Sequence, residues 1–86
     1  MPTESIRDVC DMMAKAIGHI EQEIKAKERR IRSLAERLGK LQSQPDPDPL
    51  QIQQIKADMQ ELEDQLKTDR PQLNAFQEEF AASCGS

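Results

Sequence analysis

Aromatic side chains are almost absent from this chain of 86 residues, which has no Trp, no Tyr and only two Phe, at positions 76 and 80. Glycine is also scarce, and its three residues stand far apart, so the chain has no glycine-rich loop of the kind that cradles phosphate. The sequence is rich in Ala, Leu, Ile, Glu, Lys, Arg and Gln, which favour helices. The composition therefore predicts an all-α protein and argues against a β-fold.

Long hydrophobic runs are missing too. No apolar stretch approaches the roughly 20 residues that span a bilayer, and the first residues lack the apolar core of a secretory signal. We therefore expect a soluble, cytoplasmic protein. The net charge of −4 argues against general binding to nucleic acid or to an anionic membrane, because phosphate binding depends on clustered positive charge.

Residues that could carry chemistry are few. The two cysteines, Cys10 and Cys84, and the single histidine, His19, cannot make a zinc site, which takes four closely spaced ligands. No nucleophile or acid stands at a spacing that would complete a triad with His19, which we expect to be exposed. The sequence thus predicts no enzyme: no catalytic residue, no cofactor, no metal and no small-molecule substrate.

Apolar residues form two long stripes. They recur alternately four and three apart, a mean spacing of about 3.5 residues that is typical of a helix packed along one partner helix. A charged residue interrupts each stripe once, Lys27 in the first and Asp69 in the second. The first stripe is Ile6, Cys10, Met13, Ile17, Ile20, Ile24, Lys27, Ile31, Leu34, Leu38 and Leu41, and the second is Ile52, Ile55, Met59, Leu62, Leu66, Asp69, Leu73, Phe76 and Phe80.

A proline-rich segment separates the stripes. Residues 42–49 read Q-S-Q-P-D-P-D-P, in which three prolines prevent a helix from continuing. Asp48 and Pro49 then supply an N-cap and a first-turn proline for a second helix. We expect Ser5 to cap the first helix. We predict a helix over 5–42, a turn over 43–48 and a helix over 49–82. Pro71 should kink or break the second helix near 69–71.

Because the connection is short, the helices must fold back on each other. The resulting single domain, 1–86, is an antiparallel two-helix hairpin of the coiled-coil type. Lys27 and Asp69 fall in adjoining layers, where an ion pair between them would fix the register. Residues 3–41 carry a net charge of +2 and residues 46–86 a net charge of −6, which favours contact between the arms. In this register Glu21 flanks Arg70, and Glu28 lies near Glu63, a like-charge contact. Apolar residues of the two helices face each other in pairs along the rest of the seam. The pairs are Leu41 with Ile52, Leu38 with Ile55, Leu34 with Met59, Ile31 with Leu62, Ile20 with Leu73, Ile17 with Phe76 and Met13 with Phe80.

The end of the hairpin opposite the turn carries more apolar surface than one partner helix covers. We expect two hairpins to pair there as a homodimer, which makes a four-helix bundle, or a helical protein partner to bind this surface. The same end brings Cys10 and Cys84 together. The sequence leaves three alternatives for them: a disulfide within the chain, a disulfide between two chains, or free thiols. Small residues that merely fill a splayed terminus are the alternative to a binding surface. The predicted partner-binding residues are Val9, Met12, Met13, Ala16, Phe76 and Phe80.

Two other functions stay open. The order of helix, P-D-P-D-P turn and helix resembles in outline the small needle subunits of bacterial type III secretion systems and their hairpin co-chaperones, which implies a secretion-apparatus component. The cysteine in the stripe and the long regular heptads depart from a needle subunit. The basic stretch 25–40 would suit a nucleic-acid or membrane accessory protein, but Glu28 and Glu36 interrupt it and no aromatic residues are interleaved for base stacking.

Overall fold

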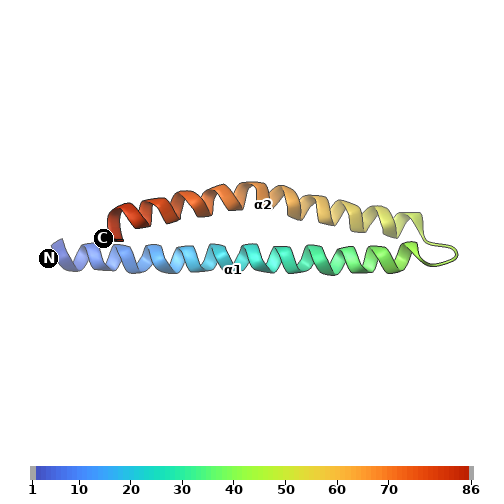
Figure 1. Cartoon of the computed structure of the whole chain (residues 1–86), viewed down its shortest axis with the longest axis horizontal. Helices are drawn as coiled ribbons and strands as arrows, with labels where there is room; N and C mark the ends of the chain where they lie inside the picture. Colours follow the sequence, from blue (N-terminus) through green and yellow to red (C-terminus); the bar gives the residue numbers. More distant parts are fainter. Residues whose placement is uncertain (1, 86) are drawn as a thin grey trace.

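The computed structural model describes residues 2–85, and the side chains of residues 6–85. Its two helices, α1 (Pro2–Gln42) and α2 (Pro49–Cys84), lie side by side in opposite directions. They form a rod of 68 × 17 × 15 Å with the two ends of the chain together and the turn at the far end (Figure 1). The predicted antiparallel two-helix hairpin is confirmed.

The turn follows from its prolines and aspartates. At the end of α1, the Ser43 backbone N–H donates to the Gly39 carbonyl at 3.1 Å, and the Ser43 hydroxyl donates to the same oxygen at 2.8 Å. The Asp48 carboxylate then accepts a hydrogen bond from the Leu50 backbone N–H at 2.9 Å, with Pro49 in the first turn of α2. These bonds satisfy groups that helix ends leave without partners, and they confirm Asp48 as the N-cap.

Two details of the helices differ from the prediction, and of the kink or break expected near Pro71 the break does not occur. The first helix begins at Pro2, so Ser5 lies inside it and is not its cap, since a proline fits the first helical position. The second helix continues past residue 82 to Cys84, where a disulfide ties down its last turn. It also runs unbroken through Pro71, and α2 bows away from α1 in its middle part (Figure 1), as the loss of one backbone N–H allows.

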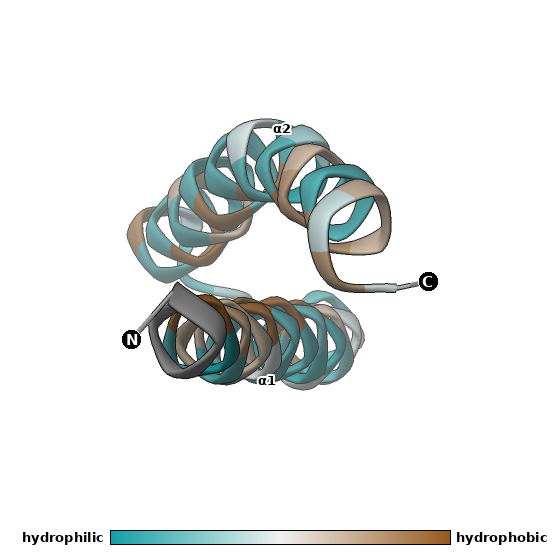
Figure 2. Cartoon of the chain, turned by 90° about the vertical axis from the view of Figure 1, so that its left-hand side faces the viewer, coloured by the Kyte–Doolittle hydropathy of each residue, from teal (hydrophilic) through white to brown (hydrophobic). Residues whose placement is uncertain are grey.

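The seam between the helices is the predicted pair of stripes. Every residue of the two stripes except Ile6 is buried or half-buried, whereas nearly all other described residues are exposed. Seen along the rod, the helices cross at a shallow angle, and hydrophobic residues of α1 lie on the surface that faces α2 (Figure 2). Two helices can bury only a single line of side chains. Among residues 6–85 the buried side chains, at 2–8% exposure, are Ile17, Ile24, Leu34, Ile55 and Leu66.

Two ion pairs cross the middle of the seam. The Lys27 ammonium lies 2.5 Å from the Asp69 carboxylate, and both side chains are about three-quarters covered, at 24% and 20% exposure. The next residues along each helix form a more exposed pair of reversed sign, in which the Arg70 guanidinium lies 3.4 Å from the Glu28 carboxylate. Arg70 thus pairs with Glu28 and not with Glu21 as predicted. Because the sign alternates between neighbouring pairs, a slip by one residue would place like charges together.

Candidate interaction face at the open end

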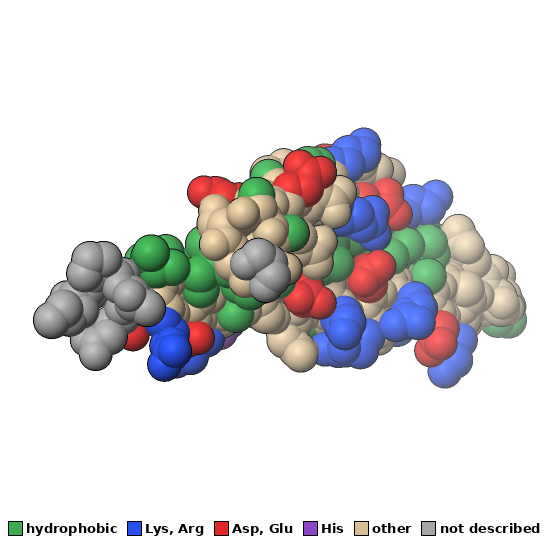
Figure 3. Space-filling view, turned by 60° about the vertical axis from the view of Figure 1, so that its left-hand side comes forward, with side chains coloured by type: hydrophobic (Ala, Val, Ile, Leu, Met, Phe, Trp, Pro, Cys, Tyr) green, Lys and Arg blue, Asp and Glu red, His purple; other side chains and the backbone are tan. Residues whose placement is uncertain are grey.

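Large hydrophobic side chains are exposed at the end of the rod where the termini meet. We call this region, residues 6–16 of α1 and 73–84 of α2, the open end. Ile6, Val9 and Met12 are 61%, 53% and 70% exposed there. Residues three and four apart share one face of a helix, so Ile6, Val9, Met13 and Ala16 form an apolar strip that continues beside the seam. Figure 3 shows hydrophobic side chains gathered on α1 beside the end of α2.

This strip and α2 enclose two adjoining hollows. One, of about 270 Å³, is almost wholly apolar, and the other, of about 420 Å³, includes both cysteines in its wall. Val9 and Met13 line both hollows, so the two are neighbours, and we call them together the open-end groove. Its residues are Ile6, Val9, Cys10, Met12, Met13 and Ala16 from α1, and Phe76, Glu79, Ser83 and Cys84 from α2.

A disulfide closes the open end. The sulfur atoms of Cys10 and Cys84 are bonded, and their Cα atoms lie 5.9 Å apart, a separation of 74 residues along the chain. Both side chains are half-buried at the end of the seam. The chain is therefore a closed loop, with the proline-rich turn at one end and a covalent bond at the other.

The rod exposes more surface than a protein of its mass needs to. A compact monomer of 9.8 kDa exposes about 5,200 Å², whereas this chain exposes 6657 Å². The excess of about 1,500 Å² is larger than the roughly 800 Å² that each partner buries in a standard stable interface. The excess follows from the elongated shape of the rod, and three of its exposed large hydrophobic residues, Ile6, Val9 and Met12, lie at the open end.

The structure brings most of the predicted partner-binding residues together. Val9, Met12, Met13, Ala16 and Phe76 line one hollow, whereas Phe80 is half-buried in the seam and lines neither hollow. The prediction missed Ile6, which it assigned to the seam. The first turns of α1 extend beyond the end of α2 (Figure 1), so Ile6 has no seam partner there. The sequence held one signal for this: the predicted second helix has no stripe position left to face Ile6.

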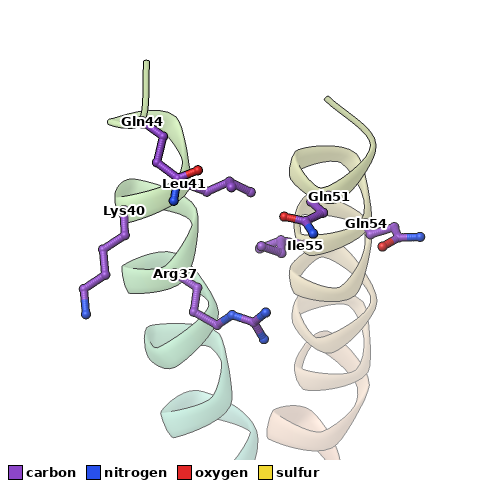
Figure 4. Close-up of a pocket in the computed structure, with 7 residues that line it drawn as sticks. All are labelled: Arg37, Lys40, Leu41, Gln44, Gln51, Gln54 and Ile55. Atoms are coloured by element: carbon purple, nitrogen blue, oxygen red, sulfur yellow. The ribbon is translucent and has the colours of Figure 1, made fainter. Parts of the chain in front are cut away.

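The opposite end of the rod has a hollow of a different kind. It measures about 330 Å³ and lies beside the turn, where Leu41 and Ile55 point toward each other between the helices while Lys40 and Gln54 point away (Figure 4). Its polar residues are exposed at the surface. This hollow is therefore mostly polar, unlike the open-end groove. Its remaining lining residues are Arg37, Gln44 and Gln51.

Other candidate residues gather into no site. His19 is exposed, and within the basic stretch 25–40 Lys27 turns inward to Asp69 while the other cations are exposed. Among residues 2–85, no three His, Cys, Asp or Glu side chains are placed to hold a metal ion. Neither helix, over the part of the chain that is described, has an apolar stretch long enough to cross a membrane.

The chain was also compared with known proteins. No protein-family model, no curated protein and no solved structure matches it.

Proposed function

We propose that this chain is a non-enzymatic assembly module, a helical hairpin that pairs with a second copy of itself through the open-end groove. Two hairpins joined in this way make a four-helix bundle. The observation that carries the proposal is the groove itself, an apolar strip of α1 that α2 leaves uncovered at one end only. Assembly through this face would place the exposed hydrophobic residues in a core, which is the dominant favourable term in most protein association.

The groove is suited to pairing with its own copy. In a two-fold interface the same patch meets itself, so each copy must offer both a protruding group and a hollow. Met12, the most exposed large hydrophobic residue, protrudes beside the apolar hollow lined by Val9, Ala16 and Phe76. A methionine side chain is flexible and fills irregular gaps well. Met12 of each copy would enter the hollow of the other.

Charge leaves this pairing to the apolar residues. Residues 6–16 of α1 carry two basic and two acidic side chains, and residues 73–84 of α2 carry two acidic ones. The excess of basic residues on α1 lies in the stretch 25–40, outside the open end.

The test is sedimentation equilibrium of the oxidised chain over a wide range of concentrations. We expect a discrete dimer, and we expect Met12→Glu to raise the dimer dissociation constant at least about a hundredfold, because two carboxylates would lose their water in the apolar hollows. Leu50→Glu is the matched control. Leu50 is 63% exposed, close to the 70% of Met12, but lies beside the turn, so the control should dimerise like the wild type.

Three results would contradict the proposal. A chain that stays monomeric at every concentration has no self-assembling face, and a dimer that Leu50→Glu disrupts uses a different one. Filaments that grow with concentration would favour the needle-like secretion component instead. Salt-sensitive binding of the monomer to DNA, RNA or anionic vesicles would favour an accessory role for the basic stretch 25–40.

A further inference from the structure

The disulfide is part of the groove and not only a clamp behind it. Cys10 and Cys84 both line the larger hollow, together with Val9 and Met13, which also line the smaller one. The bond holds the last turn of α2 against α1 at this point. Any motion of residues 73–84 away from α1 would therefore remove one wall of the groove, including Phe76.

Side chains pack that wall less tightly than the middle of α2. Among residues 6–85, the buried side chain nearest the open end is Ile17 on α1, and α2 has no buried side chain beyond Leu66. Its last seam residues are only half-buried. Pro71 removes a backbone hydrogen bond within this same part of α2. Segments with few buried contacts open most readily, so the end of α2 depends on its covalent bond.

We propose that the Cys10–Cys84 disulfide is a redox switch for assembly: the oxidised chain presents the open-end groove to a second copy, and the reduced chain loses it. This inference rests on the proposed function. In the switching step a dithiol gives two electrons and two protons to the S–S bond, which becomes two thiols, and the dithiol becomes a cyclic disulfide by thiol–disulfide exchange. The setting matters, because the cytosol keeps thiols reduced whereas secretory compartments preserve such bonds.

The expected size of the effect follows from population arithmetic. If the open end of the reduced chain is closed for about one-tenth of the time, its apparent affinity for a partner falls about tenfold. Both copies must be closed for a two-fold pair to form. The dimer dissociation constant should therefore rise about a hundredfold on reduction.

The experiment compares the oxidised chain, the same chain treated with dithiothreitol, and the variant Cys10→Ser with Cys84→Ser. Each is examined by sedimentation equilibrium and by hydrogen–deuterium exchange. We expect a rise of about a hundredfold in the dissociation constant for the reduced chain and for the variant, with no further change when dithiothreitol is added to the variant. Hydrogen–deuterium exchange should become faster in residues 73–84. It should stay slow around Leu34 and Ile55, and this protection would show that the variant is folded.

The outcomes separate the two proposals. If all three samples dimerise equally, or if the reduced chain dimerises more tightly, the switch is wrong while self-assembly stands. If the oxidised chain itself stays monomeric, self-assembly fails and the switch fails with it. Weaker dimers of the reduced chain and of the variant, with the turn end still protected from exchange, support the switch.

Discussion

The turn end and the open end of the rod are built on the same heptad pattern, yet they are held closed in different ways. Toward the turn, Leu34 and Ile55 are buried at 5% and 7% exposure, and the chain connects the helices directly. At the open end none of the described residues 6–16 and 73–84 is buried, although Ile17 directly beside them is, and a disulfide replaces the turn. Large apolar residues outside the stripes are exposed at both ends, Leu50 beside the turn and Val9 with Met12 at the open end.

The difference shows how much apolar surface two helices can bury against each other. A hairpin buries one line of side chains from each helix, so a stripe of that width is satisfied within one chain. Extra residues such as Val9 and Met12 lie outside that line and stay in water unless another surface covers them. The greater excess at the open end, where Ile6, Val9 and Met12 are all exposed, is therefore the feature that distinguishes this face from ordinary hairpin packing.

Removing the disulfide should have the largest effect on stability. Closing a loop of this length lowers the entropy of the unfolded chain by an amount worth about 4 kcal/mol, so Cys10→Ser with Cys84→Ser should lose roughly that free energy of unfolding. Urea denaturation followed by circular dichroism measures it. A loss under about 1 kcal/mol would mean that side-chain packing alone closes the open end, and the contrast between the ends would disappear.

Truncating the seam should cost more where it is fully buried. Leu66, at 2% exposure, and Leu73, which is half-buried, are one heptad apart on α2. Leu66→Ala should lower the free energy of unfolding by about 3 kcal/mol and Leu73→Ala by about half as much, because the cost grows with the cavity left behind. Both are measured by urea denaturation of the oxidised chain. Equal losses would show that the seam is packed alike along its length.

The central ion pair should matter more when half of it is removed than when both partners are replaced. Lys27→Leu alone leaves the mostly covered Asp69 carboxylate without its partner, and we expect a loss of about 1–2 kcal/mol. Adding Asp69→Leu should restore or slightly raise the thermal stability. A double-mutant cycle by thermal denaturation gives the coupling. A cooperative loss of helicity in the double variant would contradict the prediction.

Charges on the exposed apolar residues should change folding stability least. Below the concentration at which the chain dimerises, Met12→Glu and Leu50→Glu should both lie within about 0.5 kcal/mol of the wild type, because both sites are exposed. The two variants should differ only in association. If Met12→Glu alone destabilises the monomer, Met12 packs within its own chain and the open end is not a free face.

Much of the fold was readable from local patterns. The spacing of Ile17, Ile24 and Leu34 identified the seam of α1. Asp48 and Pro49 identified the residue at which α2 begins. Both features could be read from the sequence because caps and periodicity are local properties. The effect of Pro71 was only partly predictable. Its missing N–H is local, but whether the helix breaks or bows depends on the packing on either side.

The sequence by itself determined two amphipathic helices, a turn between them and an excess of apolar residues toward one end, since each follows from residue types at fixed spacing. Only the tertiary structure decided which of those residues stay uncovered. Ile6 fits the stripe but is exposed, because α2 does not extend past the Cys10–Cys84 bond to meet it. Likewise, the choice of Glu28 as the partner of Arg70 depends on how the two helices lie against each other, which spacing along one helix does not give.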